Sequence, residues 1–308
     1  MRFLMLCREP RLYSCQRLQQ ACEQRGISLD ILDPNRMLIR LAVEQGKSIF
    51  RLYYQAGEPY DKNRPLPELL PKYDAVLPRF GTASTEMGCR VLRYFEAQRI
   101  KVLNNATAFR LARDKWQSLQ VLAEAQITVP ATSFAGELCS FNGHLSQHHL
   151  PMVMKTLSGS QGVGVMLAES YPTAQSVLET LHQANINYLL QDFVTESKGQ
   201  DIRAFVIGDR VIAAMQRSGN EGEFRANLHR GGNAKWIYLN EAEQKLAVDA
   251  AKAIGLDVAG VDLIRSYNGL AVLEVNASPG LEGIENASGV DIAGLMIEYL
   301  LNKQNVPH

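Results

Sequence analysis

The chain has 308 residues, with 32 Lys or Arg and 32 Asp or Glu, so its formal net charge is zero. A neutral total gives no reason to expect a nucleic acid or an anionic membrane as partner, although a local basic patch is compatible with it. No apolar stretch is long enough to span a membrane or to form the core of a signal peptide. The five cysteines are scattered and contain no Cys-x-x-Cys pair, which indicates reduced thiols in a cytoplasmic protein. The length of 308 residues predicts two or three domains.

The first hundred residues alternate short apolar runs with helical segments. We expect strands at 2–7, 27–32, 73–78 and 100–103, a helix capped by Ser14 and ended by Gly26, and a helix over 85–98. The segment 35–72 is less regular, with a hairpin expected around 55–57. A β-α-β series predicts a small parallel-sheet domain, which we place at residues 1–103.

The rest of the chain divides into a second segment, 104–187, and a third, 188–308. In the second we expect helices opening at 104 and 114, a strand at 128–134, two strands around a glycine loop, and a helix near 173–185. In the third we expect a strand at 188–193, a hairpin over 201–217, a helix at 240–254, a polar hairpin, and an amphipathic final helix at 290–301.

The glycine-rich loop at 158–164 lies between two apolar strands, and Lys155 stands in the first of them. Glycines let backbone amides approach phosphate oxygens closely. The loop lacks the Gly-Lys-Ser/Thr of a P-loop, its glycine spacing does not fit a dinucleotide fingerprint, and a strand rather than a helix follows it. We therefore favour a flexible lid over a triphosphate, and a mobile surface hairpin is the alternative.

Asp262, Glu274 and Asn276 are the most informative polar residues. They belong to the segments 260–265 and 271–276, which alternate apolar and polar side chains as strands with one buried face do. Two facing carboxylates repel each other unless a cation lies between them, and hard oxygen ligands suit Mg²⁺ or Mn²⁺. We expect a divalent-metal site here, and the alternative is a pair of solvated acids on an exposed strand.

The register of this hairpin is a separate expectation. A three-residue loop at 267–269, with Gly269 left-handed, sets Asp262 directly opposite Glu274. The same register turns Leu273 to the other face, into a core. A two-residue loop would place the two acids on opposite faces, so the loop length tests the assignment.

The lid, the strand that follows it and the hairpin acids together resemble the ATP-grasp superfamily in their order and spacing. Over nearly its full length the chain is also similar to the RimK family of glutamate ligases. The matching stretches are residues 12–15, 78–83, 112–115, 199–203, 224–232 and 276–285. The strings Arg-Ala-Asn-Leu-His-Arg-Gly-Gly and Asn-Ala-Ser-Pro-Gly-Leu-Glu-Gly-Ile-Glu within the last two are specific, whereas the glycine loop alone is weak evidence.

The resemblance implies an ATP-grasp fold of class α/β, in which a Rossmann-like N-terminal domain precedes two α+β subdomains that clasp ATP. It also implies a set of site residues. ATP would be bound by Lys115, Lys155, Gln191, Asp192, Phe193, Asp201, Arg225, Ala226 and Asn227. Two Mg²⁺ or Mn²⁺ ions would be bound by Asp262, Glu274 and Asn276, and catalysis would use Arg203 and Arg225. Two departures are evident: Asp192 stands where a Glu is expected, and the segment 36–64 is longer than expected.

The implied reaction joins a carboxylate to the amine of glutamate. The γ-phosphoryl group of ATP passes to the carboxylate, and the amine then displaces phosphate from the acyl phosphate, which requires positioning and charge neutralisation but no enzyme nucleophile. This chemistry suits a sequence whose informative residues are acids, lysines and arginines, without a recognisable Ser-His-Asp set. Arg217 and Arg230 are further candidates for substrate carboxylates, and a structural salt bridge is the alternative for Arg217. For His229 we favour ordinary packing over proton transfer.

The resemblance further implies that the acceptor is the C-terminus of the sixth protein of the small ribosomal subunit. Synthesis of poly-α-glutamate from free glutamate is compatible with the same site. Such acidic substrates predict a local basic surface near the N-terminal domain, for which the candidates are Arg8, Arg11, Arg17 and Arg79, with ordinary solvated surface residues as the alternative.

Two rival functions are compatible with the sequence: an amino-acid ligase that acts on a small molecule or carrier protein, and a nucleotide-binding regulator without turnover. A homo-oligomer, such as a tetramer, is implied by the resemblance alone.

Overall fold

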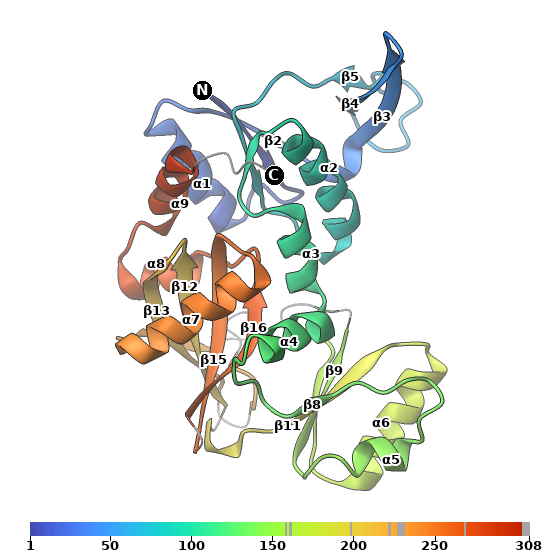
Figure 1. The fold of residues 1–308 in the computed structure, drawn as a ribbon, viewed down its shortest axis with the longest axis vertical. Helices are drawn as coiled ribbons and strands as arrows, with labels where there is room; N and C mark the ends of the chain where they lie inside the picture. Colours follow the sequence, from blue (N-terminus) through green and yellow to red (C-terminus); the bar gives the residue numbers. More distant parts are fainter. Residues whose placement is uncertain are drawn as a thin grey trace.

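The structure is a computed structural model that describes residues 1–157, 159, 162–197, 199–220, 223–226, 232–267 and 269–303 (Figure 1). Within these described residues it is an α/β protein with one parallel sheet and three antiparallel sheets. Short 3₁₀ turns lie at Pro34–Arg36, Thr82–Ser84 and Thr195–Ser197. Among the described helices, none has the length and apolar character needed to cross a membrane.

The N-terminal sheet is parallel, in the order β2 (Ser28–Leu32), β1 (Arg2–Leu6), β6 (Ala75–Pro78) and β7 (Lys101–Val102). Parallel strands bury both faces, so helices must cover both sides. On one face Leu4 and Val76 pack with α2 (Thr85–Ala97). On the other face Met5 packs with α1 (Tyr13–Glu23) and α9 (Ile292–Asn302), so the C-terminal helix completes the N-terminal layer. The expected Rossmann-like domain is confirmed.

The expected cap of the first helix is wrong. Leu12 is the N-cap of α1 and makes no side-chain capping bond, whereas Ser14 lies inside the helix. The Oγ atom of Ser14 instead accepts a hydrogen bond of 2.9 Å from the backbone N–H of Leu281. The hydroxyl of Ser14 therefore makes a tertiary hydrogen bond instead of capping the helix. This bond connects α1 to the segment that follows the polar hairpin.

A small sheet of β3 (Met37–Glu44), β4 (Lys47–Tyr54) and β5 (Glu68–Leu69) stands away from the body, at the upper right of Figure 1. Its hairpin turns at Gln45 and Gly46, both with positive φ (50° and 73°), and not around 55–57 as expected. Two consecutive positive φ values are what a two-residue hairpin turn requires. The extra length of this segment thus forms an arm.

The middle sheet is antiparallel, in the order β10 (Val165–Ala168), β9 (Met152–Thr156), β11 (Tyr188–Asp192) and β8 (Thr132–Ser133). Its separate core packs against α5 (Phe141–Leu145) and α6 (Tyr171–Gln183). The strand expected at 128–134 shrinks to two residues, and the short helix α5 is an addition. Pairing with β9 places β11 in this sheet, although the division at residue 187 assigned it to the third segment.

The third sheet has the order β14 (Asn233–Trp236), β13 (Arg210–Ser218), β12 (Gln200–Ile207), β15 (Val258–Ser266) and β16 (Gly269–Asn276). It packs against α7 (Glu241–Ile254), which begins with a capping box of Asn240 and Glu243. The short helix α8 (Glu282–Ser288) packs with α9 beside the opposite face. The helices α3 (Ala106–Arg113) and α4 (Lys115–Glu124) link the sheets, and Asp114 caps α4 through the N–H groups of Trp116 and Gln117.

Candidate ATP and metal site

The hairpin of β15 and β16 pairs Asp262 with Glu274 and Gly260 with Asn276, so the expected juxtaposition of the two acids is confirmed. The expected loop length is wrong. Ser266 pairs with Gly269, which leaves the two residues 267–268 between the strands rather than three.

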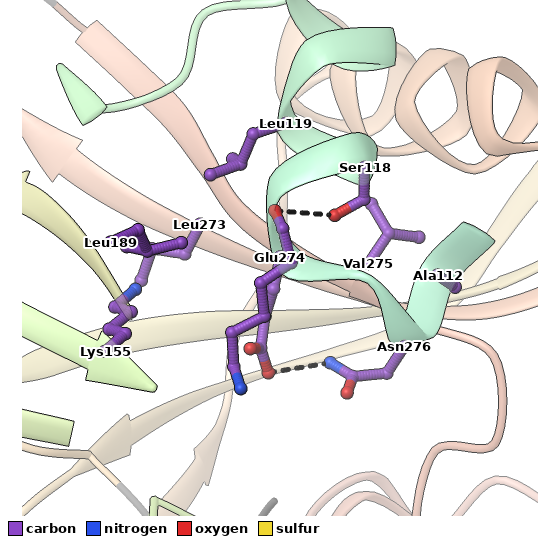
Figure 2. Close-up of a pocket in the computed structure, with 10 residues that line it drawn as sticks. Ala112, Ser118, Leu119, Lys155, Leu189, Leu273, Glu274, Val275 and Asn276 are labelled. Atoms are coloured by element: carbon purple, nitrogen blue, oxygen red, sulfur yellow. Dashed lines mark hydrogen bonds between the residues drawn. The ribbon is translucent and has the colours of Figure 1, made fainter. Parts of the chain in front are cut away.

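A register shift between Asp262 and Leu263 reconciles the short loop with the facing acids. Leu263 pairs with Val272, and Leu273 is the extra residue of a β-bulge. Val272 therefore occupies the core, whereas Leu273 lines the pocket beside Glu274 (Figure 2), which corrects the expectation that it turns inward. One inserted residue reverses the facing of every later side chain on the strand.

Two arginines hold the carboxylate of Asp262, which is only 3% exposed. Arg203 donates from Nε to Oδ1 and from Nη2 to Oδ2, both at 2.7 Å, and Arg217 Nη2 approaches Oδ2 at 2.9 Å. Burial disfavours charge on this carboxyl, but the two guanidinium groups outweigh it and hold the pKa of Asp262 well below its usual range. Asp262 is therefore ionised at neutral pH.

Arg217 forms the structural salt bridge that the sequence left open as an alternative. Its Nε and Nη2 atoms donate to the two carboxylate oxygens of Asp201 at 2.6 and 2.7 Å, and its side chain is 8% exposed. Burial raises the pKa of Asp201 to about 6, because it outweighs the lowering by Arg217. Asp201 thus belongs to one buried ionic network with Asp262 and Arg203.

Two lysines project into the space between the middle and third sheets. Lys155 on β9 donates to Gln191 Oε1 at 2.7 Å, and burial lowers the pKa of Lys155 despite the nearby charge of Glu274. Lys115, the first residue of α4, donates to the backbone carbonyls of Thr156, Leu157 and Gly159 at 2.8 to 3.3 Å. Burial also lowers the pKa of Lys115. Both cations lack a carboxylate bonded directly to them among the described residues, so a phosphate is a suitable partner.

The pocket in Figure 2 brings the two lysines together with Glu274 and Asn276 of the hairpin. It is lined by Ala112, Lys115, Ser118, Leu119, Lys155, Leu189, Leu273, Glu274, Val275 and Asn276. Glu274 and Asn276 lie side by side, because Asn276 Nδ2 donates to Glu274 Oε1 at 3.0 Å. Apolar side chains surround this polar group, which is the composition of a small-molecule site with a few placed polar groups.

The donor set suits a hard divalent cation that brings its own additional ligands. The carboxylate of Glu274 and the amide of Asn276 line the pocket, and Asp262 pairs with Glu274 on the same hairpin. Oxygens of these kinds are ones that Mg²⁺ uses alongside water and phosphate. Within the described ranges no cluster of three or more His, Cys, Asp and Glu side chains forms a complete protein cage. An ion that binds Asp262 would compete with Arg203 and Arg217 for the carboxylate oxygens.

Arg225 lies at the glycine loop rather than beside Asp262. It donates to both carboxylate oxygens of Glu223 at 2.8 Å, and its Nη1 atom donates to the carbonyls of Gly162 and Val165 at 3.2 and 3.1 Å. The loop does join antiparallel strands, as expected, because Val165 pairs with Lys155. Arg225 therefore ties the segment after β13 to the lid.

Of the remaining residues expected at the site, the structure describes Phe193 and Ala226. Phe193 packs edge to face against Phe224, with ring centroids 6.2 Å apart, and Ala226 is buried. Asn227, His229 and Arg230 lie outside the described residues.

Asp192 is engaged by a buried histidine that the sequence did not single out. His148 Nδ1 lies 2.7 Å from Asp192 Oδ1, and its Nε2 lies 2.5 Å from Ser133 Oγ, which also lies 2.7 Å from His144 Nε2. A Ser-His-Asp arrangement thus exists, contrary to expectation. Its hydroxyl is shared by two imidazoles, so it is bonded as a link in a chain rather than presented as a nucleophile. The only sequence signal was the spacing of His144 and His148, four residues apart.

Comparison with known proteins extends over the whole chain. Residues 1–109 match the RimK PreATP-grasp domain, and residues 112–300 match the RimK-like ATP-grasp domain. A protein of Haemophilus ducreyi named "Probable alpha-L-glutamate ligase" is 68% identical over 301 residues, covering 98% of this chain and 99% of its own. A protein of the same name from Mannheimia succiniciproducens is 55% identical, covering 98% and 99%.

Solved structures share the fold. A RimK domain protein from Sphaerobacter thermophilus superposes with a TM-score of 0.69 at 20% identity, covering 98% of this chain and all of that one. The ATP-grasp ligase PsnB, complexed with a minimal precursor, Mg and ADP, gives a TM-score of 0.68 at 22% identity, covering 97% of each chain. Full-length matches to both domain families, on a fold that places two lysines opposite paired acids, show that this chain belongs to the RimK-like ATP-grasp family and is an ATP-dependent ligase.

Proposed function

We propose that the protein adds glutamate to a carboxylate acceptor, with ATP as co-substrate and an acyl phosphate as intermediate. The acceptor we propose is a protein C-terminus, that of the sixth small-subunit ribosomal protein. The observation that carries the proposal is the pocket in which Lys155, Lys115 and the Glu274–Asn276 pair converge. The full-length similarity to proteins named alpha-L-glutamate ligase supports glutamate as the amino acid.

The chain's own residues have distinct tasks in this reaction. Lys115 and Lys155 neutralise phosphate oxygens of ATP, and the lid residues next to Lys115 exclude water from the acyl phosphate. Two Mg²⁺ or Mn²⁺ ions held by Asp262, Glu274 and Asn276 would neutralise the phosphates during transfer. Arg203, released from Asp262, stabilises charge on the transferring group, and Arg225 keeps the lid in place.

The adenine end of the nucleotide lies, in this proposal, along β11. Gln191 and Phe193 flank Asp192, whose Oδ1 atom accepts from His148. That bond fixes the carboxylate and leaves its second oxygen as an acceptor for an amino group. The shorter side chain of Asp192 is thereby held by a partner.

We also propose a cytoplasmic homo-oligomer. All five cysteines are free thiols, which suits a reducing compartment. The β3–β4 arm exposes Leu41, Val43 and Phe50, by 67, 74 and 45% respectively, which is the kind of surface that another subunit covers.

Mass spectrometry of the ribosomal protein after incubation with enzyme, ATP, Mg²⁺ and glutamate tests the proposal. A parallel reaction contains glutamate but no protein acceptor. The variant Glu274→Gln removes a charge from the pocket, and Glu179→Gln on the exposed face of α6 is its matched control.

A ladder of glutamate-sized mass increments with wild type and Glu179→Gln, but not with Glu274→Gln, is the expected result. Oligomers of free glutamate without modified protein would identify a poly-α-glutamate synthetase instead. Consumption of ATP with neither product would move the acceptor to a small molecule or carrier protein, and no ATP consumption would refute turnover.

A further inference from the structure

Two arginines lie with buried guanidinium groups between the N-terminal sheet and the polar hairpin. Arg79 follows the carboxyl end of β6, where ligands of parallel sheets commonly bind, and Arg113 is the last residue of α3. Arg79 Nη2 donates to the carbonyl of Pro279 at 2.9 Å, and Arg113 Nη2 donates to the carbonyl of Phe80 at 3.0 Å. Arg79 also hydrogen-bonds to the thiol of Cys15, so none of these partners is a carboxylate.

Neither arginine has a carboxylate partner among the described residues, and the Nε atom of each is buried without a hydrogen-bond acceptor. The other arginines that line the core behave differently: Arg17, Arg203 and Arg217 each bond to an acid. Buried charges in proteins are as a rule paired. Burial lowers the pKa of Arg79 and of Arg113, and the charge of Arg79 adds to the lowering for Arg113. Two adjacent cations that lack a carboxylate partner among the described residues favour an anion between them.

Their position links them to the reacting groups. Pro279 lies three residues beyond Asn276, and Arg113 lies two residues before Lys115, which lines the pocket. Arg113 is also close enough to Glu274 for that charge to raise its pKa, against the larger effect of burial. The arginine pair thus borders the acidic end of the candidate ATP pocket on the side of the N-terminal domain.

We propose that Arg79 and Arg113 form a carboxylate-binding subsite for the substrates of the ligase reaction. This inference rests on the proposed function, whose two substrates both carry carboxylates: the acceptor terminus and the incoming glutamate. A guanidinium binds a carboxylate through two parallel hydrogen bonds, and such a ligand supplies the acceptors that the two buried Nε atoms lack. Arg79, one of the four arginines considered for a basic surface, contacts the segment after the polar hairpin through Pro279.

The test uses Arg79→Gln and Arg113→Gln, with Arg79→Lys as a charge-conserving variant. Arg110→Gln is the matched control, because Arg110 lies on the same helix with its side chain 53% exposed. One arm varies a synthetic peptide that ends in Glu-Glu with a free carboxylate, at saturating glutamate. A second arm varies glutamate at saturating peptide. A third arm measures calorimetrically the binding of ATP analogue, and then of glutamate or peptide to the analogue complex.

We expect both Gln variants to raise the KM for a carboxylate substrate roughly ten- to a hundredfold, the loss typical of a charge-assisted pair. Binding of the ATP analogue stays within about threefold of wild type, Arg110→Gln behaves as wild type, and Arg79→Lys recovers part of the loss. A raised KM for the peptide assigns the subsite to the acceptor, and a raised KM for glutamate assigns it to the incoming amino acid.

The proposal is overturned if folded Arg79→Gln and Arg113→Gln keep both KM values, or lose only kcat. It is also overturned if Arg79→Lys retains its melting temperature but binds both ligands as wild type does, since the two parallel bonds are then not needed. Failure of the proposed function gives a different result, because wild type itself transfers no glutamate. In that case the calorimetric arm still decides whether the two arginines bind carboxylates.

Discussion

Replacement of Arg203 by Gln should lower the free energy of unfolding of the metal-free protein and increase its affinity for divalent cations. In the structure Arg203 makes two bonds of 2.7 Å to Asp262, and its own side chain is 15% exposed. Removal of one partner of a buried ion pair costs about 3–5 kcal/mol. Because Arg217 remains bonded to Asp262 at 2.9 Å, we expect a smaller loss than that range, about 2–3 kcal/mol.

The gain in metal affinity has the same origin. A cation that binds Asp262 competes with Arg203 for its carboxylate oxygens, and this competition is absent from the variant. If about 1.4 kcal/mol or more of that interaction reappears as binding energy, the affinity for Mn²⁺ rises at least about tenfold. Electron paramagnetic resonance titration of free Mn²⁺ measures the affinity, and thermal unfolding without metal measures the stability.

Two further variants separate competition from simple charge. Arg203→Lys keeps the charge but loses the two-bond geometry, so partial gain of affinity indicates competition for the oxygens. Arg210→Gln, on the same hairpin with an 80% exposed side chain, controls for the general loss of a positive charge. Unchanged or weaker Mn²⁺ binding in folded Arg203→Gln would refute the competition, and with it the role of Asp262 as a ligand.

Three other predictions follow from the same site. Lys155→Met should keep or raise the melting temperature, because burial already lowers the pKa of this lysine. Equilibrium titration should show the affinity for ATP reduced about tenfold or more. Unchanged affinity for ATP would exclude a contact between Lys155 and a phosphate. The folded-state pKa of Asp262 lies below its ordinary 3.8, so its stabilisation is full above that value and lost as pH falls. The melting-temperature gap between wild type and Asp262→Asn should therefore be largest above about pH 4 and narrow below it. His148→Ala should lower the free energy of unfolding by about 1–3 kcal/mol, measured by thermal unfolding, and raise the Kd for ATP several-fold. If Ser133→Ala raises the Kd for ATP equally, the bond between His148 and Asp192 is not the cause of the weaker binding.

The main elements could be predicted because their signals are local. Apolar runs mark β1 and β6, and Asp114 and Asn240 cap their helices as their positions suggest. The predictions fail where a residue distant in the sequence determines a side chain's hydrogen-bond partner. Ser14 has the chemistry of a cap, but the N–H of Leu281, far along the chain, takes its hydroxyl. No local pattern contains that partner.

The hairpin acids illustrate a subtler limit. The facing of Asp262 and Glu274 was predicted correctly from a loop of the wrong length, because a bulge compensates for the missing loop residue. Alternation alone does not locate a bulge, since Val272 and Leu273 are both apolar. Likewise the sequence identifies Asp192 as a polar residue on a strand but does not reveal that His148 binds it.

The hydrophobic core is divided unevenly between the sheets. Leu4 of the N-terminal sheet and Leu263 of the polar hairpin belong to one continuous core, which Leu189 of β11 also joins, whereas β9 and β10 contribute Met154 and Ala168 to a second core. Asn104 strengthens the first core, because its Nδ2 atom donates to the carbonyls of Val258 and Ala277 at 2.7 and 3.0 Å. The polar hairpin therefore packs with the N-terminal sheet, and the strands on either side of the glycine loop pack mainly around the second core. Lys115 bridges the two through lid carbonyls, which are the partners that an ATP phosphate would replace. In the proposed reaction, nucleotide binding would exchange a contact to the carbonyls of Thr156 and Gly159 for one to ATP, in the pocket that Glu274 lines.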